Sequence, residues 1–177
     1  MYFVSELLSG IFLIYVKCYE LHYDSRDCLT FATKKHLAEG TAPCMCEKLS
    51  LWCSYCSSIF KITQHPVYPC FAILTAFNPR STVISNKENR LRHSQLTKEL
   101  RRSGFSFESV VTCSPDGRWA EQGVMVAMDK SEACRVAARW EQNAIYWVEN
   151  GELFLVPVLL AGFEQQSLGD WRGFLYT

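Results

Sequence analysis

The sequence has no excess of charge of either sign and no hydrophobic run long enough to span a membrane. Lysine and arginine total 18, as do aspartate and glutamate, so net charge gives no argument for a nucleic-acid or anionic-membrane partner. The apolar stretch at residues 2–16 is shorter than the roughly 20 residues that cross a bilayer, and it contains Glu6. It also lacks a basic start and a clear cleavage site, which argues against a signal peptide. We expect a buried or interface helix there, with membrane contact as the less favoured alternative.

Common catalytic signatures are missing as well. No Ser-His-Asp, HExxH, Walker or Rossmann pattern is present, and His93 is the only histidine after residue 66. Whether the protein is an enzyme therefore stays open.

Cysteine is abundant, but the count of nine is odd, which fits poorly with a fully paired disulfide framework. We interpret these residues mostly as reduced thiols of a cytoplasmic protein. The hydrophobic fraction of 49% is sufficient for a globular core.

The chain divides into two parts of different character. Six of the nine cysteines lie in residues 1–66, where periodicity is weak after Val16, and Pro66 and Pro69 indicate a joint. We expect residues 1–66 to be a cysteine-rich N-terminal extension of uncertain order that adds little stability, and residues 67–177 to be an α+β domain. Whether the extension belongs to the natural product is left open.

Four cysteines of the first part have a spacing that approaches that of a zinc site. Cys44 and Cys46 form a CxC pair, Cys53 and Cys56 form a CxxC pair, and six residues separate the two pairs. Four thiolates hold zinc tetrahedrally, and His36 or His65 could substitute. The gap between the pairs is shorter than in most zinc ribbons, so buried thiols are the favoured alternative and no cofactor is predicted.

The second part shows clear element signals. The apolar run 71–77 predicts a buried strand, and Ser85 with Glu88 predicts a capping box that opens a helix ending at Gly104. Further strands are expected at 105–113, 119–128, 144–148 and 153–160, with a second helix capped by Asp129 and Glu132 and a hairpin turn at Asn150-Gly151. This order predicts a ferredoxin-like split βαβ sheet with two helices on one face and an added C-terminal hairpin strand.

A specific set of residues occurs at characteristic spacings over roughly residues 70–160: Thr75 to Pro79, Ser81, Ser85, Asn89, Arg90, Asp116, Gly117, Trp119, Glu121, Gly123, Gln142 to Ala144 and Trp147. In these residues the chain resembles an uncharacterised bacterial family, domain of unknown function 3293. The resemblance implies a small bacterial or phage-type cytosolic protein and no established activity.

The first candidate site is the loop after the first strand together with the start of the helix. Backbone N–H groups at a helix N-terminus favour anions, and serine, asparagine and arginine side chains add donors. These residues are Asn78, Arg80, Ser81, Ser85, Asn86, Asn89 and Arg90. Plain helix capping and turn formation is the favoured alternative.

A second candidate site comprises Trp119, Glu121, Gln142 and Asn143. Trp119 and Gln142 could line the same cleft as Asn78. Glu121 lies in an otherwise apolar strand, and a desolvated carboxylate there is a weak candidate for a general acid or base. A solvent-facing or ion-paired glutamate is the commoner case.

The helix 86–102 is basic, which would suit nucleic-acid phosphates. Glu88 and Glu99 interrupt the positive charge, so a solvated face is favoured and nucleic acid is not expected.

We therefore expect a small binding or regulatory domain that recognises a phosphate- or carboxylate-bearing ligand or a protein partner. The alternatives are an enzyme acting on a nucleotide-like or phosphate-bearing substrate through Glu121 with Arg90, and nucleic-acid binding by the basic helix.

Overall fold

The computed structural model describes residues 45–176, and a compact unit begins at Trp52. The predictions for residues 2–16, for Cys44 and for His36 lie outside the described residues. Within them, no helix is both long and apolar enough to cross a membrane. The elements are α3 (Met45–Cys56), β1 (Ile59–Ile62), β2 (Cys70–Thr75), η1 (Pro79–Ser81), α4 (Asn86–Arg102), β3 (Phe107–Cys113), β4 (Ala120–Val126), α5 (Lys130–Arg139), β5 (Ala144–Glu149), β6 (Glu152–Pro157), β7 (Gln166–Asp170) and η2 (Trp171–Phe174).

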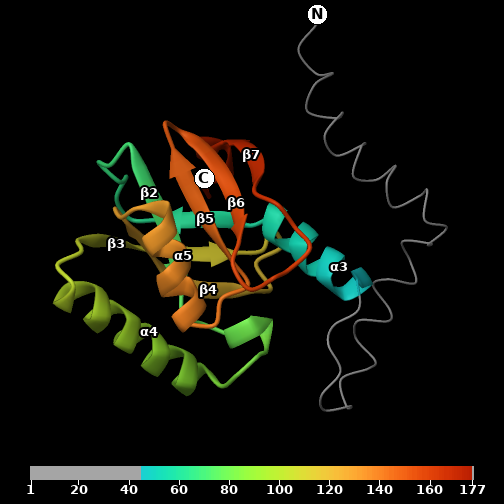
Figure 1. Ribbon diagram of the computed structural model, residues 1–177, viewed down its shortest axis with the longest axis horizontal. Coiled ribbons are helices and arrows are strands. Elements are labelled where there is room, and N and C mark those ends of the chain that lie inside the picture. Colours follow the sequence, from blue (N-terminus) through green and yellow to red (C-terminus); the bar gives the residue numbers. More distant parts are fainter. Residues whose placement is uncertain (1–44, 177) are drawn as a thin grey trace, which may run out of the picture. The chain divides into compact units, whose positions relative to one another are not determined.

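The strands form one seven-stranded antiparallel sheet in the order β1-β3-β4-β2-β5-β6-β7, so the predicted α+β class is confirmed (Figure 1). The sheet is curled. Phe60 of the edge strand β1 forms a parallel bridge with Leu175, which follows β7 at the opposite edge and the short helix η2. The two edges of the sheet therefore approach each other through the C-terminal segment.

Helices α4 and α5 pack on the same face of the sheet (Figure 1). One apolar cluster contains Leu96 and Leu100 of α4, Val136 of α5, and Leu74 and Val124 of the central strands.

Capping residues predicted the start of each helix. Ser85 and Glu88 make the predicted capping box at α4. The capping box predicted at α5 was wrong, because the Asp129 side chain makes no cap hydrogen bond, and the Glu132 carboxylate binds Arg135.

The opposite face of the sheet has an aromatic core. Phe60, Phe71, Tyr146 and Trp171 are buried and contact one another edge-on or at a tilt. Strand alternation places Glu121 on this face as well, because it pairs with Thr112, which in turn pairs with Phe60. A carboxylate therefore lies on the same side of the sheet as an aromatic cluster.

The compact unit begins at Trp52, which is earlier than the boundary predicted at Pro66 and Pro69. Strand β1 lies within residues 1–66 yet pairs with β3, and its Phe60 is fully buried. Trp52 is also buried and stacks on Phe163. A strand of four residues is too short to give a periodic signal, and Pro66 and Pro69 lie in the connection between β1 and β2.

Candidate functional site

The loop between β2 and α4 has an unusual backbone. Asn78, Arg80 and Ser81 all have positive φ values, of 44°, 53° and 59°. L-residues with side chains disfavour this left-handed region, although asparagine tolerates it best. Three such residues within four positions persist only where the surrounding structure holds them.

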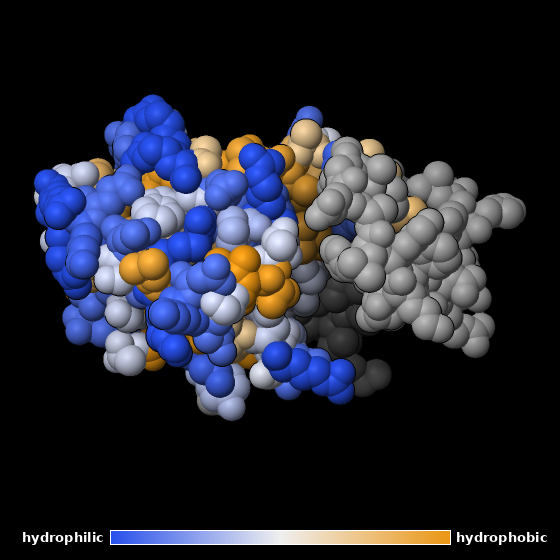
Figure 2. All heavy atoms as spheres, turned by 90° about the horizontal axis from the view of Figure 1, so that it is seen from below, coloured by the Kyte–Doolittle hydropathy of each residue, from blue (hydrophilic) through white to orange (hydrophobic). Residues whose placement is uncertain are grey.

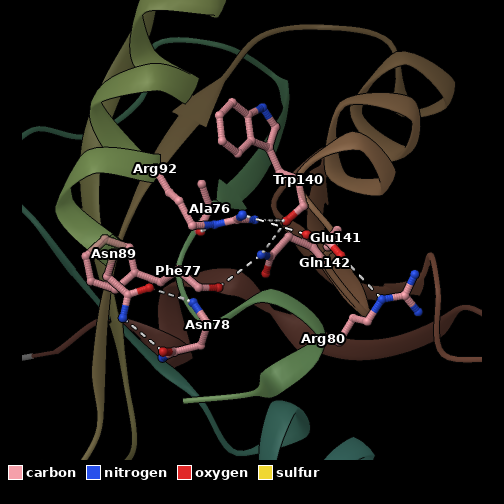
Figure 3. A network of polar contacts seen from close by, with 9 residues as sticks. All are labelled: Ala76, Phe77, Asn78, Arg80, Asn89, Arg92, Trp140, Glu141 and Gln142. Carbon is pink, nitrogen blue, oxygen red and sulfur yellow. Dashed lines mark hydrogen bonds and ion pairs between the residues drawn. The ribbon is translucent and has the colours of Figure 1, made fainter. Parts of the chain in front are cut away.

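Asn78 and Asn89 hold the start of this loop (Figure 3). The Asn78 backbone N–H donates to Asn89 Oδ1 at 2.8 Å, and Asn89 Nδ2 donates to Asn78 Oδ1 at 2.9 Å. Asn78 Oδ1 also accepts from the Ile84 backbone N–H at 3.2 Å. Asn89 is only 3% exposed, so this reciprocal pair ties both ends of the loop to the first turns of α4.

Glu121 of β4 lies beneath the same loop. It is 7% exposed, and its Oε1 accepts a 2.7 Å hydrogen bond from Asn78 Nδ2. Burial raises the pKa of Glu121 to about 7, because desolvation outweighs the favourable bond from Asn78. Its carboxyl group therefore keeps its proton to a higher pH than an exposed glutamate does.

A second cluster of polar side chains surrounds Ser81, the last residue of η1. Ser81 Oγ is 2.5 Å from the Tyr55 hydroxyl, and it accepts a hydrogen bond from Asn143 Nδ2 at 3.0 Å. Tyr146 donates to the Tyr55 carbonyl at 2.8 Å. Burial is the main cause that raises the pKa of both tyrosines, so both phenol groups stay neutral at physiological pH.

Arg92 joins this loop to the connection between α5 and β5 (Figure 3). Its Nε donates to the Ala76 carbonyl and its Nη2 to the Trp140 carbonyl, both at 2.7 Å. Nearby, Gln142 Nε2 donates to the Phe77 carbonyl at 3.0 Å. The Arg80 backbone N–H donates to the Glu141 carbonyl at 2.7 Å. Residues 76–81 are thus bonded to residues 140–142.

The residues predicted from the sequence fall into three groups. Asn78, Asn89, Glu121 and Gln142 form the frame, and their polar atoms bond to protein groups. Arg80, Ser81, Ser85 and Arg90 are exposed on or beside the loop. Trp119 is bonded through its backbone within the turn between β3 and β4, where Ser114 is its partner.

The structure does not bring Arg90 to Glu121. Arg90 is exposed, and no cation contributes to the pKa of Glu121. The arginine that reaches the frame is Arg92, which was not predicted from the sequence. Tyr55 was also missed, because it lies 26 residues before Ser81 in a segment with no distinguishing pattern.

The zinc prediction stays untested, because Cys44 lies outside the described residues. Within residues 45–176, no group of three or more histidine, cysteine, aspartate or glutamate side chains could hold a metal ion. Burial and the neighbouring Cys53 raise the pKa of the Cys56 thiol to about 11, and its sulfur lies 3.7 Å from Gln166 Oε1. Cys56 is therefore a protonated thiol at neutral pH.

Neither a curated protein nor a solved structure is significantly similar to this chain. A family model does match part of it. The matched segment contains the loop, α4, Glu121 and Gln142, and it ends within β5. Residues 74–145 match the family described as Protein of unknown function (DUF3293), which confirms the resemblance over that segment.

Proposed function

We propose that this protein is a small binding domain that recognises a phosphate or carboxylate group, on a ligand or on a partner, through the exposed side of the loop 78–85. The contacts would come from Arg80, Ser81, Ser85 and Arg90. The observation that carries the proposal is the left-handed backbone at Asn78, Arg80 and Ser81, held by buried hydrogen bonds. Backbone strain of this kind costs about 1–3 kcal/mol per residue and clusters at functional sites.

The difference between the hydrogen-bonded and the exposed residues of the loop supports this proposal. The frame residues are bonded internally, so they fix the loop. Of the outer side chains, Arg80 and Arg90 extend into solvent, whereas the hydroxyl groups of Ser81 and Ser85 would exchange their present bonds to Tyr55 and Glu88 for bonds to the anion. Arg80 pairs with Glu141 at 3.5 Å, with the two side chains 65% and 45% exposed. An exposed pair of this length contributes little, so an anionic group can replace Glu141 at small cost.

A thermal-shift experiment with inorganic phosphate and pyrophosphate tests the proposal. Pyrophosphate should raise the midpoint of the wild-type protein, and Arg80→Ala should weaken its binding by about 1.5–3 kcal/mol, the size of a hydrogen bond to a charged group. Arg118→Ala is the matched control, because Arg118 is 88% exposed in the turn between β3 and β4. The proposal fails if neither anion shifts the wild type, or if both variants lose binding equally.

A second candidate function is acid–base catalysis on a nucleotide-like or phosphate-bearing substrate. The observation in its favour is Glu121, whose raised pKa of about 7 suits proton transfer at neutral pH. Its partners would be Asn78 and the Tyr55–Ser81 pair instead of Arg90. Turnover that is lost in Glu121→Gln but retained in Arg80→Ala would favour catalysis over binding.

We also propose that β2, α4, β3, β4, α5 and β5 form a ferredoxin-like split βαβ unit, extended at one edge by β6. The neighbour order β3-β4-β2-β5, with α4 and α5 as the crossover connections, supports this assignment. A bacterial, cytoplasmic setting is proposed with it, supported by the family resemblance and by the odd number of cysteines.

A further inference from the structure

The outward side of α4 carries cations near both of its ends. The helix contains six lysine and arginine residues against two glutamates, and only Arg92 turns inward to bond the protein backbone. The other five are exposed: Lys87, Arg90, Lys98, Arg101 and Arg102. Figure 2, which views the molecule from the side on which α4 lies in Figure 1, shows mainly hydrophilic residues there.

The two acids of α4 do not interrupt this row. Glu88 lies in the first turn, where its carboxylate accepts bonds from the backbone and hydroxyl of Ser85. The Glu99 carboxylate is bound by Arg139 Nη2 at 2.5 Å and by the Trp140 indole N–H at 3.0 Å. The exposed cations at the two ends of α4 are therefore not paired with the acids of this helix.

A shallow groove runs along the C-terminal half of this row. Its volume is about 410 Å³, and it is lined by Gln95, Lys98, Glu99, Arg102, Ser103 and Trp140. Two cations, two neutral hydrogen-bonding side chains, an indole and the Glu99 carboxylate, which Arg139 binds, thus surround one depression. Cations that follow a backbone, together with an aromatic side chain on which a base can stack, are the features that single-stranded nucleic acids require.

We infer that the outer side of α4, with the groove beside Trp140, binds the sugar–phosphate backbone of a single-stranded nucleic acid. From Lys87 to Arg102 the helix rises about 22 Å at 1.5 Å per residue, enough to follow several phosphates. Lys98 and Arg102 would contact phosphates, Gln95 and Ser103 would donate hydrogen bonds, and a base would pack against Trp140. Arg90 belongs both to this surface and to the exposed side of the loop 78–85, but none of the residues that line the groove does, so the inference does not rest on the function proposed above.

An anionic membrane is the less favoured partner of the same surface. Membrane-surface helices set a broad apolar face against their cations. The exposed side of α4 offers one large apolar residue, Leu91, which is 59% exposed. The groove also combines hydrogen-bond donors with an aromatic wall, which a lipid headgroup layer does not need.

Fluorescence anisotropy of the full chain with a labelled 20-nucleotide single strand, across 50–300 mM salt, tests the inference. Binding should weaken steeply with salt. Lys98→Ala/Arg102→Ala should weaken it at least tenfold and reduce the log–log salt slope by about 1.4, which is about 0.7 for each lost phosphate contact. The matched control is Arg118→Ala/Arg172→Ala, which removes the same charge from two exposed positions outside α4.

The control double variant should bind within about twofold of the wild type, and a duplex of the same sequence should bind more weakly than the single strand. Circular dichroism confirms that both double variants are folded. No binding at 50 mM salt, equal loss in both double variants, or an unchanged salt slope would overturn the inference. Tighter binding to phosphatidylserine vesicles than to the oligonucleotide would overturn it as well.

Discussion

The side-chain nitrogen of Asn78 lies 2.7 Å from the carboxylate of Glu121, a bond between residues 43 positions apart in the chain. It joins a left-handed loop residue to a buried acid in the sheet. The loop conformation and the ionisation of Glu121 are therefore linked, because the same bond favours the charged form that burial disfavours.

Glu121 should make the wild-type protein less stable as the pH rises. Its folded-state pKa of about 7 exceeds the ordinary value of 4.5, so between these values the folded protein binds the proton that the unfolded chain releases. Its contribution to stability is present below about pH 4.5, is lost up to about pH 7 and is constant above. The free energy of unfolding of the wild type, relative to Glu121→Gln, should fall by about 2–3 kcal/mol between pH 5 and pH 8.

Urea denaturation of both proteins at several pH values measures this difference. Comparison with Glu121→Gln removes the opposite trend expected from His93, whose pKa is lowered by burial. A difference that does not change with pH would show that Glu121 does not titrate in this range.

Asn89→Ala should destabilise the protein by about 1–3 kcal/mol. The variant leaves the Asn78 backbone N–H without the 2.8 Å acceptor Asn89 Oδ1, and a buried donor without a partner incurs its desolvation penalty. Asn86→Ala is the control at the exposed first residue of α4, where the loss should be below about 0.5 kcal/mol. Chemical denaturation of the two variants measures their free energies of unfolding. Equal losses of stability in Asn89→Ala and Asn86→Ala would mean that the Asn78–Asn89 hydrogen bonds do not hold the loop.

Arg92→Met should cost more stability than Arg90→Met. The Arg92 guanidinium binds the Ala76 and Trp140 carbonyls, and hydrogen bonds of charged groups contribute about 1.5–3 kcal/mol. Arg90 is exposed, so its loss should cost less than about 0.5 kcal/mol. Thermal and urea unfolding measure both variants, and the reverse order would contradict the assignment of Arg92 to the frame.

Gly123→Ala should destabilise the sheet by about 1–3 kcal/mol, the range for an overpacked core position. A Cβ atom at Gly123 would lie 2.7 Å from the Leu74 backbone oxygen of the neighbouring strand. At Gly173 an added Cβ has no atom within 4 Å, so Gly173→Ala should leave the unfolding free energy nearly unchanged. Similar unfolding curves for both variants would show that β2 and β4 can move apart freely.

The parts of the fold that were predictable from the sequence are those set by local chemistry. The Ser85–Glu88 capping box starts α4 as expected, and Asn150 and Gly151 take the positive φ values that a tight hairpin turn needs. Strands β1 and β7 were not predicted. The first has four residues, and the second, Gln166–Asp170, is polar and contains a glycine.

The candidate site was predictable only in outline. Asn78 and Asn89 were selected because they follow a strand and begin a helix, and they are bonded to each other. Helical periodicity could have identified Arg92 as the site residue instead of Arg90, because Arg92 lies three residues after Asn89 and shares its face of the helix. The contact of Tyr55 with Ser81 had no local signal, because it depends on how distant segments pack.

The loop 78–85 is proposed as a binding surface for an anionic group, and an amide NMR titration with pyrophosphate tests this role most directly. The expected result is a saturable set of chemical-shift changes at the amides of Arg80 to Ser85, which is lost in Arg80→Ala and kept in Arg118→Ala. Shift changes confined to residues 95–103 of α4 and its C-terminus, or none that saturate, would contradict the claim.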